Sequence, residues 1–132
     1  MSKRIVNPEE LFDGSAFGMS QAVVETTAGL VFVSGQVDWN HQHEISESSV
    51  EGQLQKAFEN LSIALAAAGS SIDKLLHVRV YVRGELGEYS STAGPILARF
   101  LGESRPALTV IGVASLASPE TLVEIEAIAS VS

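Results

Sequence analysis

The sequence predicts an α/β protein, an α+β two-layer sandwich in which two helices pack on one face of a mixed sheet, in the order β-β-α-β-α-β-β. Three observations predict it. Two short β-branched runs come first, a strongly periodic helical segment follows them, and a second helical segment separates a third strand from two final strands. The 132 residues suit one domain, residues 1–132.

The first two strands are expected at Ser20–Thr26 and Leu30–Val37, which are short and rich in β-branched residues. Thr27–Gly29 lies between them and has the glycine that a hairpin loop favours. A polar loop follows the second strand.

The first helix is predicted from Val50 to Ala68, where apolar residues recur at helical spacing. Ser48 and Glu51, three residues apart, have the pattern of a capping box at its start. Gly69 is placed to end the helix, because glycine adopts the left-handed conformation of a C-terminal cap without strain.

The second half of the chain supplies three strands and a helix. Strands are expected at Leu75–Val82, Ala107–Leu116 and Leu122–Val131, and a helix at about Glu88–Leu101. Pro95 requires that this helix either begin near it or kink there, since a proline inside a helix removes a hydrogen bond. Alternation divides the first of these strands into two faces: Leu76, Val78, Val80 and Val82 on one, and Leu75, His77, Arg79 and Tyr81 on the other.

The face of the sheet away from the helices needs a cover of its own. The strand at Ala107–Leu116 is apolar on both sides, with Leu108 and Val110 on one and Ile111 and Val113 on the other. Two helices on one side of the sheet cannot cover both faces, so we expect the chain to form an oligomer through its open face.

Composition excludes several classes of function. The formal net charge is −8, from 16 acidic and 8 basic residues without a basic cluster, which argues against nucleic acid or an anionic membrane as partner. The absence of cysteine excludes disulfides, thiolate zinc sites and cysteine nucleophiles. No apolar run approaches the roughly 20 residues of a membrane span, and the first residues lack the apolar stretch of a signal peptide. A cytoplasmic location is expected.

Two acidic residues, Glu124 and Glu126, lie inside the apolar last strand and share the face away from the helices. They are either solvated residues of the sheet surface or, in an oligomer, residues that line a cleft. A partly buried carboxylate there would have a perturbed pKa and could act as a base toward water. His41 and His43 form an H-x-H pair, but no third ligand stands at useful spacing, so no metal site is expected.

Four stretches carry a family resemblance: LVFVSGQV at 30–37, QLQKAFENLSIALAAAG at 53–69, HVRVYV at 77–82 and GVASLASPETLVEIEAIA at 112–129. Together they resemble the RidA family, also called YjgF-like or endoribonuclease L-PSP, over nearly the whole chain. The resemblance implies a chorismate-mutase-like fold and a homotrimeric barrel with ligand clefts between subunits. It also implies hydrolysis of reactive enamines and imines to 2-keto acids and ammonia, without a metal or cofactor.

The family's substrate-binding arginine is missing. In imine-hydrolysing members it follows Pro-Ala and binds the substrate carboxylate, which its planar guanidinium matches in a bidentate way. Here Pro106 and Ala107 are present, but Leu108 stands at the position of the arginine and is followed by Thr109 and Val110. Weak or absent hydrolysis of 2-imino acids is therefore expected. A leucine at this position also suggests a ligand that is less acidic or more apolar.

Other family positions divide into departures and matches. Met19 stands where the family often has tyrosine, and Ala93 where it often has asparagine. Gly35 of the Ser-Gly-Gln turn and Glu124 match the family, in which the acid at this position is thought to position or activate water.

Arg105, Arg79 and Arg83 are candidates to replace the missing arginine. Arg105 precedes Leu108 by three residues, which is about 10 Å in an extended strand and places it on the opposite face. A loop before the strand would relax this constraint.

Three functions follow from these observations. The first is a hydrolase of an imine, an enamine or a related small molecule, with Glu124 assisting a water. The second is a non-catalytic trimer that binds a metabolite or a protein. The third, a ribonuclease or translation inhibitor, is disfavoured by the net charge of −8.

Overall fold

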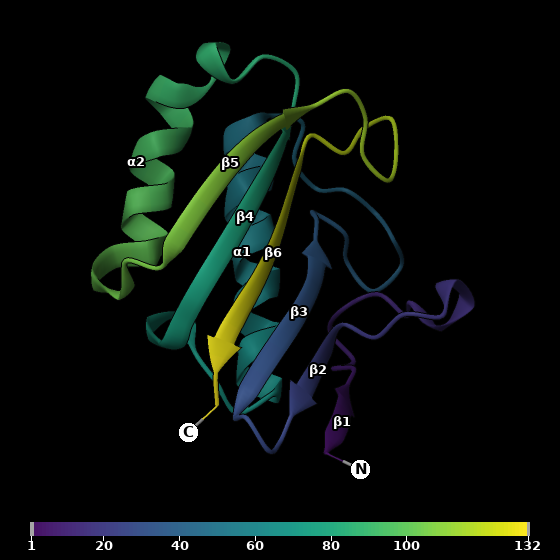
Figure 1. The fold of residues 1–132 in the computed structure, drawn as a ribbon. Helices are drawn as coiled ribbons and strands as arrows, with labels where there is room; N and C mark the ends of the chain where they lie inside the picture. The colour runs from purple at the N-terminus through teal and green to yellow at the C-terminus, as the bar shows by residue number, and fades with distance from the viewer. Residues whose placement is uncertain (1, 132) are drawn as a thin grey trace.

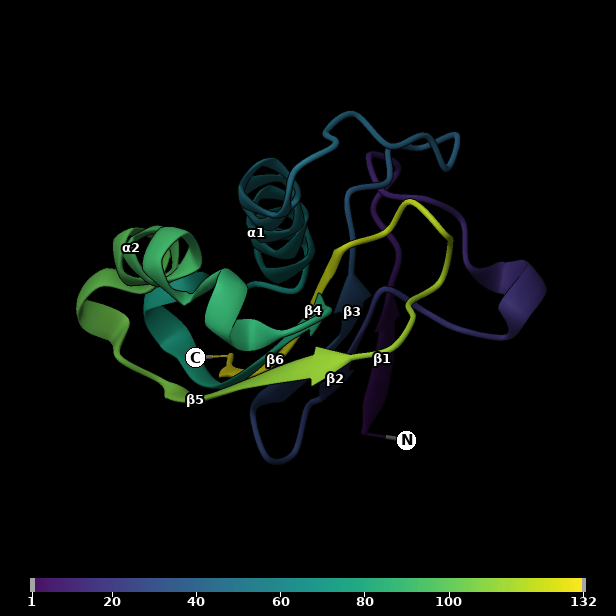
Figure 2. The same cartoon turned by 90° about the horizontal axis from the view of Figure 1, so that it is seen from above.

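The computed structural model describes residues 2–131 as a six-stranded mixed sheet with two helices on one face (Figures 1 and 2). The sheet order is β1-β2-β3-β6-β4-β5. The elements are β1 (Lys3–Val6), β2 (Ala22–Glu25), β3 (Leu30–Gln36), α1 (Val50–Ala67), β4 (Leu75–Arg83), α2 (Ser90–Leu101), β5 (Ala107–Val113) and β6 (Val123–Ser130).

The fold class is the one that the sequence predicts, but the element order gains a strand and becomes β-β-β-α-β-α-β-β. The additional strand, β1, pairs antiparallel with β2 at the edge of the sheet. Its four residues are Lys-Arg-Ile-Val, of which only Val6 is buried. Short, charged edge strands resist pairing with other chains, and they also lack the alternation that would reveal them in a sequence.

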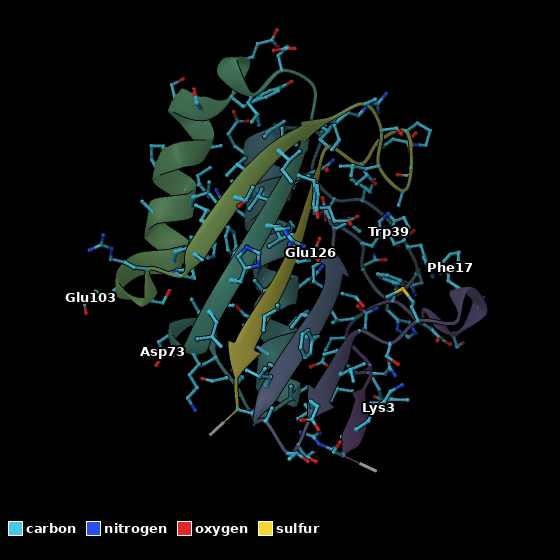
Figure 3. All side chains as sticks on the ribbon, in the orientation of Figure 1. Lys3, Phe17, Trp39, Asp73, Glu103 and Glu126 are labelled. Atoms are coloured by element: carbon cyan, nitrogen blue, oxygen red, sulfur yellow. The ribbon has the colours of Figure 1, made fainter. Side chains whose placement is uncertain are left out.

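The C-terminal strand lies in the middle of the sheet. β6 pairs antiparallel with β3 on one side and with β4 on the other. β4 and β5 are parallel, and α2 makes the crossover between them. Residues of β6 therefore occupy the centre of both faces, which explains why Glu126 lies near the middle of the open face in Figure 3.

The core lies between the sheet and α1. The helix buries a continuous apolar stripe against the inward residues of the central strands: Leu54, Ala57, Phe58, Leu61, Ala64 and Leu65 against Val78, Val80, Val123 and Ile125. Phe58 also stacks on Phe100 of α2, with ring centroids 4.7 Å apart. Burying a large apolar side chain stabilises a fold by about 1.5–3 kcal/mol, so this stripe fixes α1 on the sheet.

The ends of α1 are capped, although not by the predicted pair. Ser49, rather than Ser48, is the N-cap, and its hydroxyl accepts a hydrogen bond of 3.0 Å from the amide of Gly52. The helix ends before Gly69, which has a φ of 85°, and the amide of Ser70 donates to the carbonyl of Leu65. This is the Schellman arrangement that a glycine at this position favours.

One local prediction is wrong, and one of two open alternatives is excluded. Leu75 is buried and Leu76 is 49% exposed, because a register shift between Leu75 and His77 reverses the expected alternation at the start of β4. The second helix begins at Ser90 and contains Pro95, so it does not begin near the proline. No helix among residues 2–131 is long and apolar enough to cross a membrane.

Candidate functional site

A cavity of about 380 Å³ lies at one end of the sheet, beside the two longest loops. Phe17 and Trp39, two of its lining residues, lie on the same side of the molecule in Figure 3. Its walls come from the segment before β2, from the end of β3 and the loop after it, and from β6 with the loop before it. The lining residues are Phe12, Phe17, Met19, Ser34, Gly35, Val37, Trp39, Ala117 and Glu124.

Glu124 is the one charged residue of this lining, and its position depends on Gly35. The pairing of β3 with β6 shifts register between Val33 and Gln36, so Ser34 and Gly35 form a bulge. A Cβ on Gly35 would overlap the end of the Glu124 side chain and come within 2.6 Å of its Cδ. Bulges often redirect side chains beside functional sites, and here the glycine leaves room for the carboxylate.

Burial raises the pKa of the Glu124 carboxyl, and the nearby negative charge of Glu126 raises it further. Both effects disfavour the ionised form, because a carboxylate loses hydration in the cavity and is repelled by a like charge. A carboxyl with a raised pKa is a stronger base when it is ionised, and its pKa lies closer to neutral pH, where both the ionised and the protonated forms are available for proton transfer.

The aromatic wall of the cavity is held by the loop after β3. The rings of Phe12 and Trp39 meet edge to face, with centroids 4.9 Å apart and planes at 81°. The His43 ring packs against both at 5.1 Å. Asn40 closes the loop, since its Oδ1 accepts hydrogen bonds from the amides of Gln42 and Glu44. The two aromatic rings are thereby packed against each other and against His43, which is not part of the lining.

Met19 reaches the same cavity because another glycine makes space for it. A Cβ on Gly14 would lie 2.8 Å from the sulfur of Met19. Gly14 precedes the short 3₁₀ turn Ser15–Phe17, which carries Phe17 into the wall. With Phe12, the segment before β2 thus contributes three apolar side chains to the cavity.

Glu126 has a different environment although it is two residues from Glu124 on the same face. It forms an ion pair with Arg79, at 3.8 Å, and accepts a hydrogen bond from the hydroxyl of Tyr81. This hydrogen bond, with burial and the negative charge of Glu126, raises the pKa of Tyr81. We refer to Glu126, Tyr81 and Arg79 as the open-face cluster, since all three lie on the face that the helices leave uncovered.

The remaining predicted site residues lie elsewhere in the same chain. Arg105 and Leu108 line a groove of about 540 Å³ between α2 and the start of β5. Val110 and Ala93 line an apolar cavity of about 240 Å³ between the same two elements. Thr109 is exposed on β5. The structure therefore brings Met19, Gly35 and Glu124 together, and separates them from the positions on β5 and α2.

Arg105 precedes β5 and has a left-handed backbone, with a φ of 39°, so the extended geometry that would place it on the face opposite Leu108 does not apply. The constraint is relaxed by the loop, as the sequence allowed. The other two arginines are engaged: Arg79 with Glu126, and Arg83 through a hydrogen bond from its guanidinium to the carbonyl of Pro119.

Comparisons with known proteins identify the family. The family model described as Endoribonuclease L-PSP matches residues 14–131. The chain belongs to this family, which includes the RidA, YjgF and RutC proteins. A RutC family protein of Pyrococcus horikoshii is 31% identical over 111 residues, 83% of this chain and 84% of that protein. The mitochondrial protein mmf2 of Schizosaccharomyces pombe is 30% identical over 132 residues, 98% of this chain and 99% of its own length.

The fold agrees with solved structures of the family. A YjgF family member from Mycobacterium tuberculosis is 30% identical and superposes with a TM-score of 0.81, covering 98% of this chain and all of that one. This chain therefore shares the two-layer fold, with two helices on a mixed sheet, with a solved structure of its family.

Sequence reasoning missed the aromatic residues of the site. Trp39 lies in the polar loop after the second strand, and Phe12 lies in the first residues, for which no element was predicted; an isolated aromatic residue carries no periodic signal in either place. Trp39 is the chain's single tryptophan, and this was the one signal that could have pointed to it.

The two histidines of the H-x-H pair have separate contacts: Nδ1 of His41 lies 2.9 Å from the carbonyl oxygen of Glu9, and His43 packs on the aromatic pair. Within residues 2–131 no three acidic or histidine side chains are grouped as metal ligands.

Proposed function

We propose that this L-PSP family protein is a hydrolase of an imine, an enamine or a related reactive small molecule. The observation that carries the proposal is the Glu124 carboxyl. It is half-buried, has a raised pKa, and lies over Gly35 in a largely apolar cavity. A cavity of a few hundred Å³ with one aimed polar group has the features of a small-molecule site.

Glu124 acts as the base in the proposed reaction. Its carboxylate takes a proton from water while the water oxygen bonds to the carbon of the protonated imine, and the C=N electron pair moves to nitrogen. The protonated carboxyl then gives its proton to the amine nitrogen of the adduct. The C–N bond breaks as the hydroxyl loses its proton to Glu124, leaving a carbonyl product and ammonia, and the ammonia takes that proton from Glu124 and leaves as ammonium. An enamine substrate first takes the imine form. The proposal invokes no metal or cofactor.

The proposed assembly is a homotrimer with clefts between subunits, located in the cytoplasm. Phe32 and Leu76 are 45% and 49% exposed on the open face, which supports burial of this face against other copies. In such an assembly the groove with Leu108 and Arg105 on one subunit would meet the Glu124 cavity of a neighbour. That arrangement would join the two groups of site residues that lie apart within one chain.

Leu108 limits the proposed activity toward 2-imino acids. A leucine provides no charge-assisted hydrogen bonds to a substrate carboxylate, and such a bond is worth about 1.5–3 kcal/mol. Its loss lowers affinity about tenfold to more than a hundredfold. Arg105 is the remaining candidate to bind a carboxylate, because it lines the same groove as Leu108.

The test is hydrolysis of 2-aminoacrylate and 2-iminobutyrate, generated in situ by a pyridoxal-phosphate dehydratase with semicarbazide as a competing trap. We expect keto-acid formation to be at least tenfold slower than with an arginine-bearing family member, and Leu108→Arg to recover part of the difference. Wild-type turnover equal to the control would contradict the role assigned to Leu108, and Arg105→Ala would then show whether Arg105 binds the carboxylate.

The second candidate is a non-catalytic trimer that binds a metabolite or a protein. It is favoured by the cavity itself, in which Glu124 has no second titratable side chain beside it among the lining residues. A folded trimer that hydrolyses neither 2-imino acids nor imines without a carboxylate would support this candidate. Ribonuclease or translation inhibition is the third and least favoured, since the net charge of −8 opposes RNA binding.

A further inference from the structure

The Glu124 cavity combines one acid with an aromatic wall. Three rings, a thioether and two aliphatic side chains make up most of the lining, and no lysine, arginine or histidine is part of it. The aromatic and aliphatic members are Phe12, Phe17, Met19, Val37, Trp39 and Ala117. Within one chain the charge of this cavity is therefore negative when Glu124 is ionised, and no residue of its lining balances it.

A carboxylate ligand is unsuited to this environment. It would place a second negative charge beside Glu124, which is already destabilised by burial and by Glu126. The net charge of −8 also repels anions at longer range. A cation would instead be attracted, because it would neutralise the charge of Glu124 in a cavity from which water is partly excluded.

The aromatic wall favours a flat cation. The face of a tryptophan ring attracts cations most strongly among the aromatic side chains, and a desolvated contact is worth about 2 kcal/mol. Trp39 is held in place by Phe12 and His43, so it binds without a loss of side-chain freedom. The bulge at Gly35 fixes Glu124 on another wall of the same cavity. A planar head group can thus reach the carboxylate while the rest of the ligand contacts the rings.

We propose that this cavity binds a flat, carboxylate-free cation, and that the substrate is the protonated imine of an aromatic aldehyde or ketone. The substrate half rests on the proposed function. The overall reaction is the aryl iminium ion plus water giving the carbonyl compound and ammonium, with Glu124 transferring the proton from water to nitrogen. No oxidant, reductant or further reactant is needed.

Three probes of nearly equal shape test the ligand class: benzamidinium, benzamide and benzoate. Each has one phenyl ring and a planar head group, and their charges at pH 7 are +1, 0 and −1. Binding to the full-length protein is measured by the fluorescence of Trp39, the single tryptophan. We expect benzamidinium to bind at least tenfold more tightly than benzoate, with benzamide between them. Benzoate binding as tightly as benzamidinium, or more tightly, would overturn the proposal and indicate that Arg105 of a neighbouring copy enters the site.

A matched pair of variants locates the charge. Glu124→Gln keeps the shape of the side chain and removes the charge, so the affinities for benzamidinium and benzamide should converge. Glu126→Gln removes the charge two residues away, on the open face, and should keep the preference for the cation. A preference for benzamidinium that survives in Glu124→Gln would refute the role of Glu124.

A second readout does not depend on the folding of a variant. In wild-type protein labelled with ¹³C at the glutamate carboxyls, benzamidinium should shift the Glu124 signal more than the Glu126 signal. The reverse order would place the cation on the open-face cluster and overturn the assignment.

Hydrolysis of an aryl imine is measured separately, so that the two proposals can fail independently. Selective benzamidinium binding without turnover would leave the cation site standing and refute the hydrolase. Turnover of 2-imino acids that benzoate inhibits better than benzamidinium would refute the cation site and leave the hydrolase.

Discussion

Glu124 and Glu126 lie on the same face of the same strand, yet their surroundings differ in kind. Glu124 lies over the bulge of β3, in an apolar cavity, and burial is the main cause of its raised pKa. Glu126 is paired with Arg79 and Tyr81 on the open face. The neighbouring strand therefore decides the environment of each carboxylate. β3 offers Gly35 and a cavity to one, whereas β4 offers an ion-pair partner, Arg79, and a hydrogen-bond donor, Tyr81, to the other.

Gly35→Ala should have the largest effect on the environment of Glu124. The new Cβ would overlap the Glu124 side chain, which must rotate away from its place in the cavity. We expect benzamidinium affinity to fall at least tenfold, about 1.4 kcal/mol. The measured quantity is the dissociation constant from Trp39 fluorescence. Overpacking should also lower the free energy of unfolding by about 1 kcal/mol, because the overlapping side chain is able to move.

Gly87→Ala is the matched control for this substitution. An added Cβ on Gly87 meets no atom within 4 Å, so neither affinity nor stability should change by more than about 0.5 kcal/mol. Unaltered binding in Gly35→Ala would mean that the position of Glu124 over the glycine does not matter for the ligand.

Tyr81→Phe tests the other side of the comparison. It removes the hydroxyl that donates to Glu126 and leaves Glu124 over Gly35. The partners are partly exposed, so we expect the lower part of the range for a hydrogen bond, a loss of about 0.5–1 kcal/mol in the free energy of unfolding. Denaturant unfolding at pH 7 and fixed protein concentration measures it, and benzamidinium affinity should be unchanged.

Tyr89→Phe supplies the control, since Tyr89 is the only other tyrosine and lines the apolar cavity beside α2. A loss in Tyr89→Phe as large as in Tyr81→Phe would show that the measured effect is general to tyrosine and not specific to the open-face cluster.

These differences also show what the sequence could and could not predict. The two faces of β6 followed from alternation alone, and the structure confirms them, with Val123, Ile125, Ala127 and Ala129 buried. The order along the chain of both helices and of the strands other than β1 followed from periodicity. β1 escaped because four residues with one buried side chain have no period to detect. The register shift at Leu76 was not predicted, because the register is set by the partner strand, and a single sequence does not show the pairing.

The candidate site was less predictable than the fold, for a similar reason. Family resemblance pointed to Gly35, Met19 and Glu124, which the structure brings into one cavity. Alternation gave Glu124 and Glu126 equal standing, and only the bulge of β3 distinguishes them. Phe12 and Trp39 come from loops, whose path depends on side-chain hydrogen bonds such as those of Asn40. The spacing of apolar residues in the sequence does not reveal such contacts.

The smallest expected effect concerns the titration of Glu124 itself. Burial is the larger cause of its raised pKa, and the charge of Glu126 is the smaller. Glu126→Gln should therefore lower the pKa of Glu124 without returning it to the ordinary value, as followed by ¹³C NMR of the labelled carboxyls. A full return would mean that repulsion by Glu126, rather than burial, controls Glu124.

The same shift predicts how stability depends on pH. Because the pKa of Glu124 is higher in the folded state than in the unfolded state, the folded state holds this proton more tightly. The stability that this proton contributes is fully present below the unfolded-state pKa and is lost as the pH rises through the folded-state pKa. Glu124→Gln should therefore gain in relative stability across that window and keep the gain above it. Denaturant midpoints of the two proteins are measured at a series of pH values, and the midpoint of Glu124→Gln should rise relative to that of the wild type as the pH rises. If they stay parallel, the Glu124 carboxyl has the same proton affinity in both states, and the cavity does not perturb it.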